Sequence, residues 1–151
     1  MRDRFHGVFS LLLIILSIII GFLSVLNDSF VMGLWYIAII LFSPPIILYS
    51  FCAKCLCRSD SCRHVFPGRL SQLFRPRKQG RYTFWDIFWT LVALLALLLF
   101  PQYWLWKNKA FLIIFWISCL IALAEILFFV CKGCENESCP IYAVKRKEQF
   151  S

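Results

Sequence analysis

Two short segments of the chain carry closely spaced cysteines whose thiolates could bind a metal. Each begins with a C-x-x-C pair, starting at Cys52 or at Cys131, and each ends with a Ser-Cys pair. The two sulfurs of a C-x-x-C pair can turn toward one ion or cluster, and thiolates suit zinc and iron–sulfur centres. The predicted metal ligands are Cys52, Cys55, Cys62, Cys131, Cys134 and Cys139, with Cys57 as a further candidate.

These cysteines allow two ways of closing a four-ligand site. In the first, Cys52 and Cys55 join Cys131 and Cys134 in one shared site. In the second, each segment holds its own centre. The second segment has three cysteines and no histidine, so it needs a ligand from outside. This shortage favours a shared site or a ligand from a partner protein.

The identity of the metal stays open between zinc and iron–sulfur. Two separated C-x-x-C pairs are typical of zinc sites. Cys139-Pro140 is similar to the Cys-Pro pair that ends the cysteine run of bacterial ferredoxins, although the spacing differs and indicates no family. Closely spaced cysteines beside a membrane suit electron delivery, which favours iron–sulfur slightly. Structural disulfides, and cysteines without any metal, are the competing interpretations; a reducing cytosol disfavours the disulfides.

Four apolar runs must position these cysteines. They cover about residues 8–26, 30–51, 84–106 and 110–130, each long enough to cross about 30 Å of hydrocarbon as a helix. Sixty-one per cent of the 151 residues are hydrophobic, which is more than a small soluble domain can bury. The sequence predicts an all-α membrane protein with an N-terminal segment 1–7, a hairpin 8–51, a cysteine-rich loop 52–83, a second hairpin 84–130 and a tail 131–151.

The placement of basic residues predicts the orientation of the chain in the membrane. Fourteen of the sixteen Lys and Arg residues lie in the N-terminal segment, the central loop and the tail. Only Lys107 and Lys109 lie at the opposite side. The positive-inside rule therefore places both termini and all seven clustered cysteines in the cytoplasm. Basic residues near anionic lipid heads explain the net charge of +8 without nucleic-acid binding.

The two hairpins resemble each other as an internal repeat. Cys131 follows Cys52 by 79 positions, and the third apolar run starts 76 positions after the first. Two hairpins of the same orientation would be related by a pseudo-twofold axis along the membrane normal. Such an axis would bring both cysteine segments to one face.

A few other residues have separate interpretations. Glu125 lies inside the fourth run, where an acid is either a proton or cation carrier or a half-solvated group near the interface. His64 is a weak candidate ligand, Cys119 is expected to pack as an apolar side chain, and His6 is given no functional role. Thr83–Asp86 has the pattern of a capping box at the start of the third run.

Three functions follow from these patterns. The first is a cytoplasmic-face metal or iron–sulfur protein that passes electrons to a membrane partner. The second is a zinc-stapled anchor that recruits a cytoplasmic or membrane protein, and the third is a soft-metal transporter. Both histidines are expected outside the spans, which excludes a transmembrane haem pair. The sequence lacks the motifs of hydrolases and kinases, so an enzyme activity of its own has no support.

Overall fold

The computed structural model describes residues 2–54, 70–74 and 82–131, and all regular elements in these ranges are helical. The long helices are α1 (Arg2–Asp28), α2 (Phe30–Ser50), α4 (Phe84–Leu99) and α6 (Lys109–Glu125). Shorter elements are η1 (Cys52–Lys54), η2 (Ser71–Leu73), α5 (Gln102–Lys107) and the π-helical turn η3 (Ile126–Val130). The predicted all-helical class is confirmed for this part of the chain.

Four segments are long and apolar enough to span a membrane. They cover 24 residues from Phe5 to Asp28, 25 from Phe30 to Lys54, 24 from Phe84 to Lys107 and 22 from Lys109 to Val130. Most large apolar side chains point away from the protein; Leu41, for example, is 65% exposed. A chain in water would bury them, whereas lipid is a good solvent for them. The structure confirms four helices that are long and apolar enough to span a membrane, and the first candidate segment begins at Phe5 instead of Val8.

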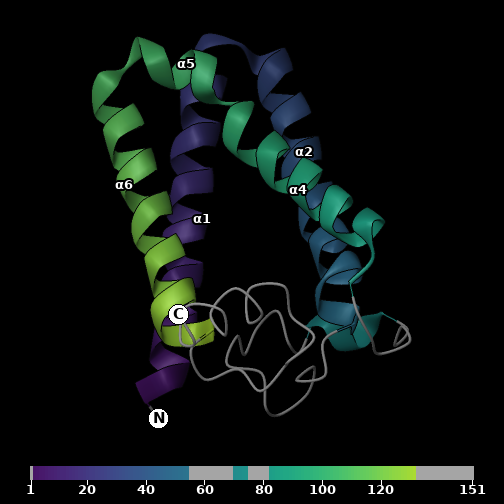
Figure 1. Ribbon diagram of the computed structural model, residues 1–151. Helices are drawn as coiled ribbons and strands as arrows, with labels where there is room; N and C mark the ends of the chain where they lie inside the picture. Colours follow the sequence, from purple (N-terminus) through teal and green to yellow (C-terminus); the bar gives the residue numbers. More distant parts are fainter. Residues whose placement is uncertain (1, 55–69, 75–81, 132–151) are drawn as a thin grey trace.

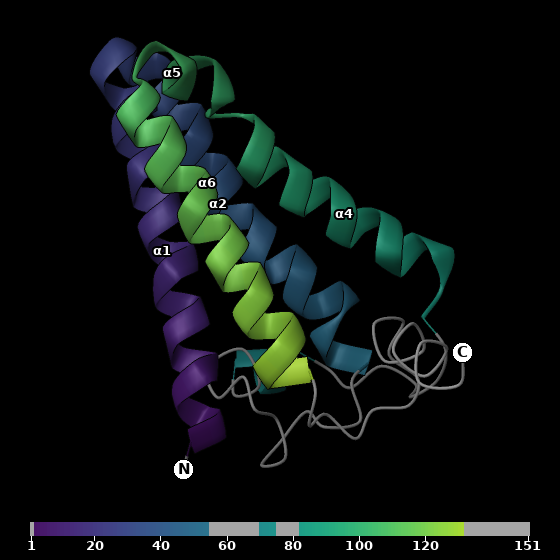
Figure 2. The same cartoon turned by 60° about the vertical axis from the view of Figure 1, so that its left-hand side comes forward.

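The helices pack in two pairs that cross the boundary between the hairpins. α1 packs mainly against α6, and α2 packs mainly against α4 (Figures 1 and 2). The two pairs meet near α5 and separate toward the opposite end (Figure 1). We call the end with α5 and the α1–α2 connection the turn end. The opposite end, with the start of α1, η1, the start of α4 and η3, is called the cysteine end.

Local sequence signals explain where the helices begin and end. Ser29 alone separates α1 from α2, and its hydroxyl accepts the N–H of Met32 at 3.5 Å. Asn108 caps α6 by accepting the N–H groups of Ala110 and Phe111. The predicted capping box is confirmed, since the Asp86 carboxylate accepts the Thr83 N–H at 2.9 Å. α2 continues through Pro44 and Pro45 as a single helix.

Pro101 separates α4 from α5. It also leaves a backbone carbonyl of α4 without its usual hydrogen-bond donor. Proline has no N–H, so the carbonyl of Leu97 has no donor within the helix. The hydroxyl of Tyr36 on α2 donates to that carbonyl at 3.1 Å. Tyr36 is fully buried, and its ring stacks on Phe100 with centroids 5.4 Å apart. The side chain of Gln102 donates to the carbonyl of Leu98 at 2.6 Å. The helix break is therefore stabilised by side chains.

Small polar residues line the contact between α1 and α6. Ser10, Ser17 and Ser24 are buried on α1 at intervals of seven residues, and Ser118 is buried on α6. The hydroxyls of Ser10 and Ser17 donate to backbone carbonyls of their own helix at 3.1 and 2.9 Å. Small, internally satisfied side chains let two helices approach closely in lipid. This seam explains the choice of α6 as the main partner of α1.

Candidate metal centre and an acid–histidine pair

The first cysteines of the two predicted metal-binding pairs lie at the same end of the molecule. Cys52 is the first residue of η1, directly after α2, and Cys131 directly follows η3. Both elements lie at the cysteine end, together with the N-terminus (Figures 1 and 2). Both side chains are half-buried. The helices thus bring the starting points of the two cysteine segments to one face of the bundle.

Most of the predicted ligands cannot be placed. Within residues 2–54, 70–74 and 82–131, no three His, Cys, Asp or Glu side chains form a group that could hold a metal ion. The remaining predicted ligands, which lie outside the described residues, are Cys55, Cys57, Cys62, Cys134, Cys139 and the weak candidate His64. The geometry of a complete site therefore stays a prediction.

Cys119 has a different environment from the clustered cysteines. It lies in the middle of α6, is half-buried, and forms a side-chain hydrogen bond with Ser17 of α1. This position is part of the α1–α6 seam and lies away from either end. Packing of a small, polarizable side chain beside Ser17 accounts for this position.

A buried ion pair anchors the segment that carries Cys52. The ammonium of Lys54 on η1 bonds to the carboxylate of Asp86 on α4, and also to the hydroxyl of Thr83 at 3.2 Å. The side chains of Lys54 and Asp86 are only 9% and 4% exposed. Losing one partner of such a pair leaves an uncompensated buried charge. The contact therefore fixes η1 against the start of α4.

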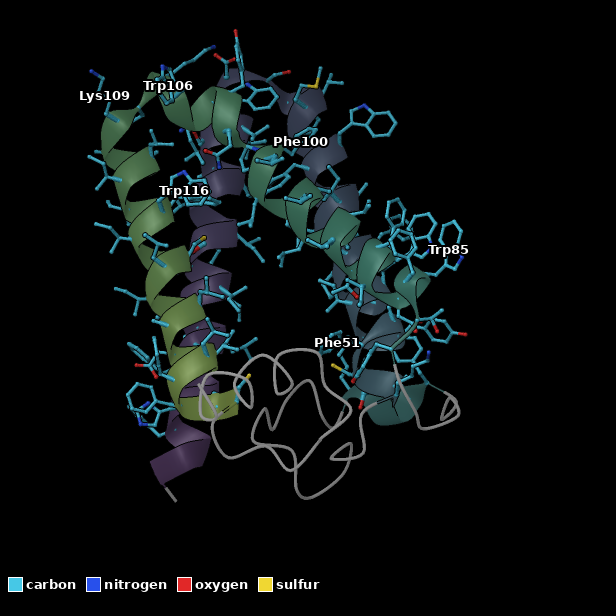
Figure 3. The ribbon with its side chains drawn as sticks, in the orientation of Figure 1. Phe51, Trp85, Phe100, Trp106, Lys109 and Trp116 are labelled. Atoms are coloured by element: carbon cyan, nitrogen blue, oxygen red, sulfur yellow. The ribbon has the colours of Figure 1, made fainter. Side chains whose placement is uncertain are left out.

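An aromatic contact reinforces this anchor. The rings of Phe51 and Tyr82 stack with centroids 4.7 Å apart, and the Tyr82 hydroxyl donates to the Phe51 carbonyl at 3.2 Å. Phe51 lies at the cysteine end of the α2–α4 pair, whereas Trp85 points outward from α4 (Figure 3). Cys52 thus follows a residue that is held by both stacking and hydrogen bonding.

The intramembrane acid has a histidine as its partner. Oε2 of Glu125, at the end of α6, lies 2.7 Å from Nδ1 of His6 in the first turns of α1. The side chains are 17% and 22% exposed. The ring of His6 also stacks on Phe129 of η3, with centroids 4.3 Å apart and planes at 8°. Glu125 is therefore paired with a residue of another helix.

The π-helical turn begins directly after Glu125. Its first N–H, from Ile126, reaches the carbonyls of both Ala122 and Leu123. Such turns are rare and occur often at functional sites because they displace the register of the following side chains. Here the turn carries Phe129 onto the His6 ring, and Cys131 follows it.

Sequence reasoning missed the role of His6 and of the Lys54–Asp86 pair. His6 was given no functional role, but it lies on the helix of the first candidate span and contacts Glu125. The available signal was Glu125 itself, because an acid in a span requires a polar partner from another helix at the same depth. Lys54 contributed only to the charge count, although its long side chain can reach a neighbouring helix.

The comparisons with known proteins found no relative of this chain. No protein-family model, curated protein or solved structure matches the chain. The functional argument therefore depends on the residues and their geometry.

Proposed function

We propose that the chain is an integral membrane protein whose cysteine end faces the cytoplasm and carries a thiolate-bound metal or iron–sulfur centre. Its role would be to pass electrons to a membrane partner. The observation that carries the proposal is the placement of Cys52 and Cys131, each the first residue of a C-x-x-C pair, at the same end of the bundle. The basic residues that surround both cysteine segments favour the cytoplasmic orientation.

The pairing of the helices supports an internal repeat. A twofold axis along the membrane normal that exchanges the hairpins would exchange α1 with α4 and α2 with α6. It would therefore exchange the α1–α6 pair with the α4–α2 pair, and these are the two main pairs of the structure. Under this proposal the centre lies near the axis, with ligands from both halves.

The anchoring of the helix ends supports a preorganised site. The Lys54–Asp86 pair and the Phe51–Tyr82 stack hold the residues around Cys52, and the His6–Glu125 contact holds the helix that leads to Cys131. Ligands on rigid elements lose less conformational entropy when they bind a metal than ligands on a flexible segment do. Closing the site then requires only the short segments that follow.

Metal and sulfide analysis of the full-length protein, purified anaerobically, tests this proposal. We expect iron with acid-labile sulfide and an absorbance band that bleaches on adding dithionite. Stoichiometric zinc without a redox response would instead support the zinc-stapled anchor. Protein with neither metal after anaerobic purification would contradict both.

The orientation has its own test. We expect an Asn108→Cys variant, in a background without the native cysteines, to react with a membrane-impermeant maleimide added to intact cells. A cysteine restored at position 52 in the same background should react only after the cells are broken. The reverse pattern would contradict a cytoplasmic cysteine end.

A further inference from the structure

The contact between His6 and Glu125 has the geometry of an oriented acid–histidine dyad. A carboxylate only accepts hydrogen bonds, so when Glu125 is ionised Nδ1 of His6 donates its proton to Oε2 of Glu125 across 2.7 Å. This fixes the tautomer of the neutral ring and leaves the lone pair on Nε2. No described group bonds to Nε2. The dyad therefore has one nitrogen that is engaged and one that can accept a proton.

Aromatic contacts fix the orientation of the imidazole ring. Phe129 stacks on it with nearly parallel planes, and Phe5 approaches with its ring at 80° and centroids 6.0 Å apart. The ring is thus held at Nδ1 by the carboxylate and across one face by Phe129. Phe129 belongs to η3, so the π-helical turn supplies the ring that stacks on the histidine.

The described side chains of the helices around the dyad include few other ionisable groups. Among the described side chains of α1, α6 and η3, the others are Asp28 and Lys109, at the turn end, and Cys119, in mid-helix. Arg2, Asp3 and Arg4 precede His6 on α1, and their side chains are not described; Cys131 follows η3. Cys131 forms no metal-binding group with the dyad.

We propose that His6 and Glu125 form a proton-exchange site at the cysteine end of the bundle. In the deprotonated form, neutral His6 donates Nδ1–H to the Glu125 carboxylate. Nε2 then accepts one proton from water, and the resulting imidazolium remains bonded to the same carboxylate, so the pair becomes neutral overall. Release of that proton restores the starting form. Histidine is the side chain best suited to this exchange near neutral pH.

This site is chemically distinct from the proposed metal centre, although the same contact also holds the helix that leads to Cys131. Its residues are a histidine and a glutamate from the α1–α6 pair, and none of the clustered cysteines takes part. The part-buried position favours the dyad because the carboxylate compensates a positive charge that lipid would otherwise disfavour. The carboxylate thus acts as a positioning and charge-balancing group for His6.

Nitrogen NMR of the full-length protein in lipid vesicles tests the proposal. The chain has two histidines, so a His64→Asn variant leaves His6 as the only labelled ring. We expect neutral His6 to show the Nδ1–H tautomer. On acidification Nε2 should shift reversibly to the imidazolium position while Nδ1 keeps its hydrogen-bonded signature. A Glu125→Leu variant should lose the tautomer preference.

Two results would overturn the inference. One is an Nε2–H tautomer in the protein with Glu125 intact. The other is a ring that stays neutral at every pH at which the protein remains folded, which would leave the dyad a purely structural contact. Both are read on protein that retains Glu125, so misfolding of Glu125→Leu cannot obscure them. A His6→Asn variant provides the matched control, because the His64 spectrum should not respond to Glu125→Leu.

Discussion

The two ends of the bundle are held together in different ways. At the turn end, contacts join helices of both pairs: Tyr36 of α2 lies against Gly21 of α1 and bonds to α4, and Asp28 of α1 bonds to α5. At the cysteine end, two polar side-chain contacts each lie within a pair. His6 and Glu125 link α1 to α6, and Lys54 and Asp86 link η1 to α4.

This difference assigns separate roles to the two ends. The turn end fixes how the two pairs meet, because its contacts cross between them. The α1–α6 and α2–α4 pairs separate toward the cysteine end (Figure 1). A centre with ligands from both halves would add a link between the pairs at this end.

The largest expected effect is the loss of the buried ion pair at the cysteine end. Asp86→Ala should lower the free energy of unfolding by about 3–5 kcal/mol, because it leaves the Lys54 charge buried without its partner. Denaturant unfolding in detergent micelles, followed by far-UV circular dichroism, measures it. Replacing both residues, as Lys54→Met with Asp86→Leu, should cost less than Asp86→Ala alone. A greater loss in the double variant would contradict this account.

Crowding at the turn end should have the next effect. A Cβ at Gly21 would lie 3.0 Å from the Tyr36 hydroxyl and 3.3 Å from Pro101. Gly21→Ala is therefore expected to lower the free energy of unfolding by about 1–3 kcal/mol through overpacking. Gly33→Ala provides a milder control, because its 3.0 Å neighbour is the flexible end of Leu26. Equal costs for the two variants would argue against the tight contact at Gly21.

Removing the Tyr36 hydroxyl probes the same contact from the other side. Tyr36→Phe should cost about 1–2 kcal/mol, because the Leu97 carbonyl loses its donor next to Pro101. Combined with Gly21→Ala, it should cost less than the two single changes added together, since the hydroxyl is the nearest clashing atom. Strict additivity in a double-mutant cycle would show that the two residues do not touch.

The smallest effect is expected for the exposed ion pair at the turn end. The Lys107 ammonium lies 2.8 Å from both Asp28 oxygens, but the side chains are 51% and 43% exposed. Because water and salt screen such pairs, Lys107→Met should change the unfolding midpoint within experimental error. A loss as large as that of Asp86→Ala would remove the distinction between the two ends.

The sequence predicts the spans well and the packing poorly. Uncharged runs of about twenty residues identify the helices because lipid forces the backbone to bond to itself. The capping box at Thr83 and Asp86 was also visible, since it depends on neighbours in sequence. Which helix packs against which depends on shape and small residues. The buried Ser10, Ser17 and Ser24 were a local signal of the helix face that packs. This signal is hard to recognise in a helix whose other faces are also apolar.

The candidate site was predicted by residue type more than by geometry. The matched C-x-x-C pairs indicated that Cys52 and Cys131 end at one face, and the structure places both at the cysteine end. The His6–Glu125 contact joins residues 119 positions apart, and no periodicity links them. Such contacts follow from the α1–α6 pairing, which the sequence does not reveal.

Metal content of single-cysteine variants tests the central claim most directly. If ligands from both halves share one centre, Cys52→Ser and Cys131→Ser should each abolish the metal bound by anaerobically purified protein. Cys119→Ser, in the α1–α6 seam, should retain it fully. Loss of about half the metal in each of the two variants would show separate centres. Full retention in either one would contradict a shared site at the cysteine end.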